Sequence, residues 1–230
     1  MTRGEYESAA DIERVVEGFC IKGVNSGFLK ENEDKQGEEG DSAYEDEEQA
    51  TRKEKKKWHF YIQDFIHVRR PKPKDMNPLV ERLANFHNKS AEKFENLTAN
   101  HRPQGTDFGY HTTTHNGKLA QDNRRISTRE YYFTRNMYKL LDHDTKKGGP
   151  RPLEMEELLR PFFCNVTPRL LRPMERYRRK ISPSRCHGDV WEGNVGVGEG
   201  GVVVVFDPGC FWGHGECMMF VPRRCTRGRS

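Results

Sequence analysis

Residues 30–57 divide the chain in two, because this stretch contains almost no side chain that a folded core could bury. Residues 31–48 hold ten acidic residues and one lysine, and residues 52–57 (RKEKKK) reverse the charge. Opposed charge blocks of this kind stay solvated and do not form a packed face. We therefore expect a disordered, charged insertion at 30–57, with folded segments before and after it.

The charge and the cysteine content exclude several classes of protein. The net charge is only +4, so the balance does not favour a nucleic-acid-binding protein. No stretch approaches about 18 consecutive apolar residues, and the start, MTRGEYESAADIE, lacks the basic and then apolar order of a signal peptide. The six cysteines form no C-x-x-C pair, so we expect reduced thiols and no zinc module. These features predict a cytoplasmic protein without membrane or nucleic-acid partners, and we expect a monomer.

After Trp58 the sequence alternates between strand and helix patterns, which predicts a mixed α/β chain. WHFYIQDFI at residues 58–66 is a dense aromatic and β-branched run and predicts a buried strand. VVVVF at residues 202–206 predicts a second, short strand that ends at Asp207.

Helical patterns fill much of the interval between these two strands. An apolar stripe at positions i, i+4 and i+7 predicts one helix and consists of Leu79, Leu83 and Phe86. Residues 153–178 are also helical in pattern. Three prolines should break this region into two segments, and they are Pro161, Pro168 and Pro173.

A further helix is predicted at 127–148. Ser127 and Glu130 have the spacing of a capping box at its start, and Lys146, Lys147 and Gly148 suit its end. Three apolar residues fall on one face of this helix, namely Phe133, Met137 and Leu140.

Four residues near the C-terminal end have a spacing that suits phosphoryl transfer. In HGDVWEGN, His187 precedes Asp189 by two positions and Asn194 follows it by five. Phosphoryl transfer to a hydroxyl needs a carboxylate that accepts the proton and metal ions that neutralise the developing charge. Asp189 lies on a loop where it could be this base, and His187 is expected to brace the loop. Asn194 and Asp207 offer the hard oxygen ligands that Mg²⁺ prefers.

These motifs resemble the fructosamine/ketosamine-3-kinase family. HGDVWEGN and the later VVVVFDPGCFWGHGE are similar to the family's HGDLWxGN and FDPxxFYGHxE. The upstream FGYHTTTHNGKLAQDN (108–123) is similar to its second signature, FGxHxxTxxGxxxQxN, and the opening GEYES resembles the start of its Glu-bearing helix. Three motifs in the family's order make the resemblance specific. The chain is similar to the fungal members, the protein-ribulosamine 3-kinases.

The resemblance implies a protein-kinase-like fold of the aminoglycoside/choline kinase type. It implies a partial N-terminal lobe at 1–66 that contains the charged insertion, a mostly helical catalytic and substrate lobe at 67–219, and an irregular basic tail at 220–230. The implied reaction is ATP-dependent phosphorylation of the sugar 3-hydroxyl of a ketosamine on a glycated lysine, which promotes deglycation. The implied partners are ATP, Mg²⁺, and glycated proteins or small ketosamines.

The same resemblance gives roles to individual residues. It makes Asp189 the catalytic base and makes Asn194 and Asp207 the Mg²⁺ ligands. It makes Glu5 the partner of the ATP-binding lysine. The strand at 58–66 would connect the lobes and present its backbone to adenine.

Five further residues are candidates for contact with the sugar. His111, Thr114 and Asn116 lie in the second signature, and they are polar enough to meet a sugar, although such a loop is also typical of a structural turn. Trp191 could stack on the substrate or pack in the core. His214 could serve as a second base.

Two parts of a kinase of this type are missing from the sequence. A Gly-rich loop and a strand lysine should precede Glu5, and only four residues do so. At the other end, RRCTRGRS stands where the family continues with helices. We therefore expect a chain truncated at both ends. Three functions remain open: an active ketosamine kinase, a non-catalytic binder of glycated substrate, and a small-molecule kinase of the aminoglycoside or choline type.

Overall fold

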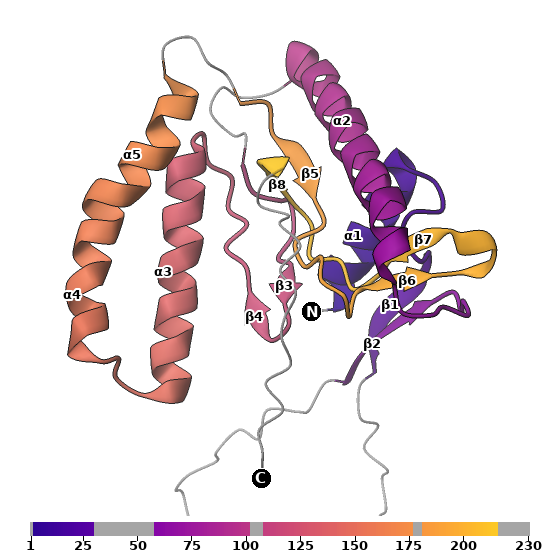
Figure 1. Ribbon diagram of the computed structural model, residues 1–230, viewed down its shortest axis with the longest axis horizontal. Coiled ribbons are helices and arrows are strands. Elements are labelled where there is room, and N and C mark those ends of the chain that lie inside the picture. The colour runs from indigo at the N-terminus through magenta and orange to yellow at the C-terminus, as the bar shows by residue number, and fades with distance from the viewer. Residues whose placement is uncertain (1, 30–57, 102–107, 177–180, 216–230) are drawn as a thin grey trace, which may run out of the picture.

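The computed structural model describes residues 2–29, 58–101, 108–176 and 181–215. The predicted insertion at 30–57 and the predicted tail at 220–230 lie outside these residues. Within the described ranges, helices alternate with short antiparallel strand pairs, which confirms the mixed α/β prediction (Figure 1). None of the described helices combines the length and the hydropathy needed to cross a membrane.

The core lies where α1 (Thr2–Val15), α2 (Met76–His101) and the β6–β7 hairpin meet. β6 (Val195–Val197) and β7 (Val203–Val205) pair antiparallel, and every residue of both strands is buried. The N–H of Ile21 donates to the carbonyl of Val205 at 3.1 Å and ties the segment after α1 to β7. The predicted valine-rich strand is therefore confirmed, and it fills the core because β-branched side chains pack well on a pleated surface.

α2 carries the predicted apolar stripe. Leu79 and Phe86 are buried, and Leu83 packs against the same core. Further along the helix, Phe94 packs on Trp212 with the ring centroids 4.9 Å apart. This second contact joins α2 to β8 (Phe211–Gly213), which pairs antiparallel with β5 (Ser184–Cys186).

α3, α4 and α5 stand together on one side of the molecule, and the short hairpin of β3 and β4 lies between α3 and the central strands (Figure 1). The bounds are α3 Arg129–Gly148, α4 Leu153–Pro161, α5 Thr167–Leu171, β3 His115–Asn116 and β4 Leu119–Ala120. Short 3₁₀ turns lie at Pro73–Asp75, Arg172–Glu175 and Glu199–Gly201.

The start of α3 differs by one residue from the prediction. Thr128, not Ser127, is the N-cap, and its hydroxyl accepts a hydrogen bond from the Tyr131 N–H. Glu130 does not close a capping box, because its carboxylate pairs in a bidentate manner with Arg172 at 2.6 and 2.7 Å. The predicted end at 148 is confirmed.

The predicted break in the second helical region occurs at Pro161. There α4 gives way to a π-helical turn at Phe162–Val166, which runs into α5 and the following 3₁₀ turn. The missing N–H of proline and the clash of its ring with the preceding turn explain why the regular α-helix stops here. The region therefore changes geometry several times without leaving a helical path.

The prediction of a buried strand at 58–66 is wrong in two respects. β2 covers only Trp58–Gln63, and its residues are exposed or half-buried. Among the described residues β2 pairs only with β1 (Gly23–Leu29), and the contact of the Tyr61 ring with Tyr6 places α1 beside it. The aromatic and β-branched run therefore correctly predicted a strand and wrongly predicted that this strand would be buried.

Candidate active site

One cavity gathers residues from distant parts of the chain. It has a volume of about 340 Å³ and is lined by Glu5, His115, Gly117, Asp189, Trp191, Asn194, Asp207 and Pro208. Glu5 comes from the first turn of α1, and Asp189 and Asn194 come from the loop between β5 and β6. Asp207 follows β7. The cavity thus contains the three residues predicted to act in catalysis and metal binding, together with the predicted partner of the ATP-binding lysine.

Asn194 holds Asp189 in a fixed orientation. The Asn194 side-chain amide donates to the Asp189 Oδ2 atom at 3.0 Å and to the Asp189 carbonyl oxygen at 3.0 Å. The Asn194 N–H in turn donates to the Trp191 carbonyl at 2.9 Å, which closes a tight loop. Asn194 is only 5% exposed, so these bonds face little competition from water. The loop therefore presents one carboxylate to the cavity in a defined direction.

Asp207 adopts a strained backbone conformation at the end of β7. Its φ is 53°, which makes it the only non-glycine residue with positive φ among the described residues. This conformation costs roughly 1–2 kcal/mol for a residue with a Cβ atom. Such strain persists where the surroundings enforce it, and it is concentrated at functional sites. Here the strain turns the Asp207 carboxylate into the cavity beside Glu5.

The loop that carries Asp189 and the loop that follows β7 are locked together. The Phe206 N–H donates to the Asn194 carbonyl at 3.1 Å, and the Gly209 N–H donates to the His187 carbonyl at 2.9 Å. Gly188 has a φ of +88°, and a Cβ atom there would lie 2.1 Å from the Gly209 carbonyl oxygen. Only glycine fits this contact, so the two loops meet backbone to backbone.

Glu5 and Asp207 form a close pair of carboxyl groups. Burial raises the pKa of Glu5 to about 7, and the charge of Asp207 and a hydrogen bond with it act in the same direction. Among residues 2–29, 58–101, 108–176 and 181–215, no lysine or arginine side chain forms an ion pair with Glu5. Two adjacent carboxyl groups at one end of the cavity favour a cation between or beside them.

The donor atoms around Asp207 fit a magnesium ion. Among the described residues, no group of three or more His, Cys, Asp and Glu side chains could hold a metal. Mg²⁺ in kinase sites, however, is commonly held by one or two side-chain oxygens together with phosphate oxygens. Asp207 offers a carboxylate, and the Asn194 amide keeps its oxygen for a ligand because its nitrogen donates to Asp189. If Mg²⁺ bound in this cavity, these two residues would be its protein ligands.

His187 braces the loop from inside the core. It is fully buried, and its Nδ1 atom accepts a hydrogen bond from the Asp189 N–H at 3.3 Å. Burial lowers the pKa of His187 to about 4, although a backbone hydrogen bond with Phe206 acts in the opposite direction. The imidazole is therefore neutral at pH 7. Its position supports the predicted bracing function, and it does not line the cavity.

The buried neutral His187 predicts a loss of stability in mild acid. In the unfolded chain the pKa of His187 is close to the ordinary histidine value of 6.5, so the unfolded state takes up a proton first as the pH falls towards 4. The contribution of neutral His187 to the free energy of unfolding should therefore decline between pH 6.5 and pH 4, with a slope of up to about 1.4 kcal/mol per pH unit. His187→Asn keeps an acceptor for the Asp189 N–H but cannot titrate. Urea unfolding should show the stability gap between wild type and variant narrowing as the pH falls, whereas a constant gap would contradict the neutral, buried state.

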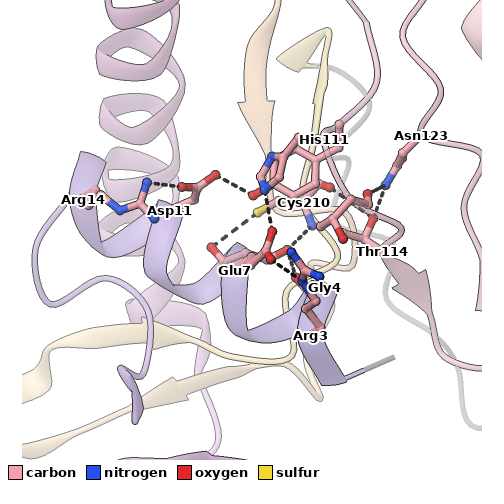
Figure 2. A network of polar contacts seen from close by, with 12 residues as sticks. Arg3, Gly4, Glu7, Asp11, Arg14, His111, Thr114, Asn123 and Cys210 are labelled. Carbon is pink, nitrogen blue, oxygen red and sulfur yellow. Dashed lines mark hydrogen bonds and ion pairs between the residues drawn. The ribbon is translucent and has the colours of Figure 1, made fainter. Parts of the chain in front are cut away.

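Thr114 belongs to the scaffold and not to the cavity. It is fully buried, its hydroxyl donates to the Cys210 carbonyl at 3.1 Å, and it accepts from the Asn123 side-chain amide at 2.7 Å (Figure 2). Gln121 adds a hydrogen bond to the Gly209 carbonyl at 3.0 Å. The polar residues of the second signature thus satisfy backbone groups of the loop after β7. The structure does not bring Thr114 to a position where it could meet a sugar.

The other predicted sugar contacts divide between different places. The His111 ring lies against Glu7 of α1 at 2.5 Å, outside the cavity (Figure 2). Trp191 lines the cavity beside Asp189. Asn116 and His214 line a second, adjoining cavity.

Sequence reasoning passed over His115, although it lies between two residues that were considered. His115 lines the first cavity, and its Nδ1 atom is buried without a hydrogen-bond partner among the described residues. Burial lowers the pKa of His115, so its imidazole is neutral at pH 7. The sequence offered one sign of this position, because His115 directly precedes the Asn-Gly turn of the β3–β4 hairpin.

Sequence reasoning also missed a buried polar network around Asp11. The Tyr110 hydroxyl donates to Asp11 Oδ2 at 2.5 Å, and Arg185 Nη1 lies 2.7 Å from the same oxygen. Arg14 pairs with Asp11 Oδ1 at 2.5 Å (Figure 2). The Arg185 guanidinium also lies over the Trp212 ring, 4.5 Å from its centroid. This network fastens α1 to β5, the strand that leads into the loop with Asp189.

The first two turns of α1 also pack tightly on the rest of the chain. A Cβ atom at Gly4 would lie 2.2 Å from the Thr113 carbonyl oxygen, so glycine is needed at this contact. The Ser8 hydroxyl accepts a hydrogen bond from the Cys210 N–H at 3.0 Å. Glu5, between these two anchors, is therefore held in place over the cavity.

The sequence matches a known family model and several curated proteins. Residues 47–225 match the model described as fructosamine kinase. Ketosamine-3-kinase of Mus musculus is 34% identical over 110 residues, which are 47% of this chain and 33% of that protein. A protein of Vibrio parahaemolyticus, named a probable ketoamine kinase, is 28% identical over 111 residues, 48% of this chain and 35% of that protein. The matched part spans about a third of the length of these curated relatives.

Two crystal structures share the fold. One, described as a putative fructosamine-3-kinase of Haemophilus somnus 129PT, superposes with a TM-score of 0.60 and 16% identity, over 96% of this chain and 60% of that chain. The other, described as a putative fructosamine-3-kinase of Thermobifida fusca YX-ER1, gives a TM-score of 0.57 and 19% identity, over 93% of this chain and 56% of that chain. The described mixed α/β arrangement therefore matches a protein-kinase-like fold.

Proposed function

Because this chain belongs to the fructosamine kinase family, we propose that it transfers the γ-phosphoryl group of ATP to the 3-hydroxyl of a ketosamine on a glycated lysine. The observation that carries the proposal is the convergence of Asp189, Asn194 and Asp207 on one cavity. A carboxylate base and two oxygen ligands are the groups that this reaction requires. Ribulosamine and fructosamine are the proposed sugars.

In the proposed reaction Asp189 acts on the acceptor hydroxyl. Its carboxylate accepts the proton of the 3-hydroxyl as the bond between that oxygen and the γ-phosphorus forms. The bond between the phosphorus and the bridging oxygen breaks, and ADP leaves. Asn194 supports this role because its amide fixes the Oδ2 atom of Asp189. When Mg²⁺ is bound, it supplies positive charge for the phosphate oxygens, and Asp207 and Asn194 are the residues that would hold it.

Two other cavity residues have proposed positioning roles. Trp191 offers a flat apolar surface beside the base, and such a surface can stack on a sugar ring. Glu5 would pair with a cationic group near the phosphates, because a cation there would offset the repulsion between the carboxylates of Glu5 and Asp207.

A direct experiment incubates the purified chain with ATP, Mg²⁺ and a peptide that contains ribulosyl-lysine, and follows the peptide by mass spectrometry. We expect one phosphate on the sugar and none on the unglycated peptide. A full-length family member serves as the positive control. If that control phosphorylates the peptide and this chain does not, the proposed activity is wrong for this chain.

A further inference from the structure

A second cavity adjoins the first. It has a volume of about 770 Å³ and lies between α3, the β3–β4 hairpin and β8. Gly117, at the turn of the hairpin, lines both cavities, and Gly188, next to Asp189, lines the second. A single elongated acceptor could therefore occupy both. The first cavity is large enough for a sugar, and the second exceeds what a sugar alone would fill.

The floor of the second cavity is apolar. Several apolar residues line it, and three of them come from one face of α3, namely Phe133, Met137 and Leu140. Their spacing predicted a shared face, and that face borders the cavity without being fully buried, since Leu140 is 45% exposed. Phe211 of β8 closes the opposite side. A ligand with aliphatic or aromatic groups would bury this surface.

The second cavity is also lined by cationic side chains. Four basic side chains line it, namely Lys118, Arg129, Lys139 and Lys147, and no Asp or Glu lines it among the described residues. No ion pair is formed by Lys118, Lys139 or Lys147 with any described carboxylate. The neighbouring Lys146, by contrast, pairs with Asp142 at 2.7 Å. A group of lysines without carboxylate partners beside an apolar floor is complementary to an acidic, amphipathic ligand.

Lys139 also lies close enough to influence the first cavity. Burial lowers the pKa of His115, and the charge of Lys139 acts in the same direction. Because His115 lines the first cavity, the positive charge of Lys139 acts on a residue at the place where the acceptor sugar would lie. An acceptor with negative charge near its modified lysine would be attracted to Lys139 and to the other basic residues of the second cavity.

We propose that the second cavity binds the polypeptide next to the glycated lysine and prefers segments that combine an aliphatic residue with acidic side chains. This inference rests on the proposed function, because it places the sugar in the first cavity. Its electrostatic part acts between partly exposed groups, so the preference should weaken as the ionic strength rises.

The test uses two ribulosyl-lysine peptides of equal length that share a leucine and differ in carrying two Glu or two Lys residues near the modified lysine. Binding is measured by calorimetry without nucleotide, so the result does not depend on turnover. We expect the acidic peptide to bind about tenfold more tightly, a difference that corresponds to about 1.4 kcal/mol. Lys139→Glu should remove or reverse the preference. Lys146→Glu is the matched control on the same helix and should leave it unchanged.

Two results would overturn the inference: equal binding of both peptides to the wild type, including no binding of either, or an equal effect of the two lysine substitutions. A parallel assay with free ribulosyl-lysine, ATP and Mg²⁺ separates this failure from that of the proposed function. Phosphorylation of the free compound with no preference between peptides rejects only the second cavity as a peptide site. Selective peptide binding without any phosphorylation rejects the kinase activity and retains the binding site.

Discussion

Replacement of Asp189 by asparagine is expected to lower kcat for the proposed ketosamine phosphorylation by about 10²–10⁴-fold, the range typical for loss of a general base. Asparagine has nearly the same shape, and its side-chain oxygen can still accept the hydrogen bond from Asn194 that holds Asp189 at 3.0 Å. The substitution therefore removes the proton acceptor with little change in geometry. Steady-state kinetics should show the loss in kcat, with KM for the acceptor changed much less.

Glu192→Gln is the matched control for this experiment. Glu192 is an exposed carboxylate on the same loop, three positions after Asp189, and it does not line the cavity. Its neutralisation should leave kcat within about twofold, since surface charges away from the site have small effects. If Asp189→Asn retained wild-type kcat, Asp189 would not be the base.

Replacement of Asp11 by alanine is expected to destabilise the fold by about 3–5 kcal/mol, the usual cost of breaking a buried ion pair. The Asp11 side chain is 5% exposed and that of Arg185 is 14% exposed, so the guanidinium would keep its charge without its carboxylate. The Tyr110 hydroxyl would lose its acceptor as well. Chemical unfolding followed by circular dichroism would measure this loss.

Glu7→Ala provides a comparison one turn away on α1. The pairs of Glu7 with Arg3 and His111 are more exposed, and such pairs contribute about 0–1 kcal/mol. The Glu7 variant should therefore unfold close to the wild type. If the two variants lost the same free energy of unfolding, the burial of Asp11 would not determine the loss. The buried network would then not be what holds α1 in place.

The residues around Asp189 could be predicted from sequence because they are close together along the chain. Asn194 follows Asp189 by five positions, and four consecutive valines predict the buried strand before Asp207. Their convergence on one cavity required only that β7 return beside the loop, which the antiparallel pairing of β6 with β7 achieves. Short separations and strong local patterns therefore explain why the sequence could predict that these residues lie together.

The Asp11 network could not be predicted in the same way. Asp11 and Tyr110 are 99 positions apart, and nothing in the helical pattern of α1 reveals which distant side chain an acidic residue will meet. For Thr114 the sequence suggested a partner that the structure does not show. Its polarity suggested contact with a sugar, but its hydroxyl is used by the Cys210 carbonyl inside the fold. Residue type alone does not distinguish a polar group that serves a ligand from one that serves the backbone.

The backbone contact between Gly188 and Gly209 has a consequence for how the proposed chemistry is prepared. With no side chain between them, the two turns can slide or separate only by losing the hydrogen bond from the Gly209 N–H to the His187 carbonyl. The spacing of the acidic groups on either side is therefore established during folding and does not await ligand arrival. Preorganisation of this kind spares the reaction a reorganisation cost at the moment when charge develops.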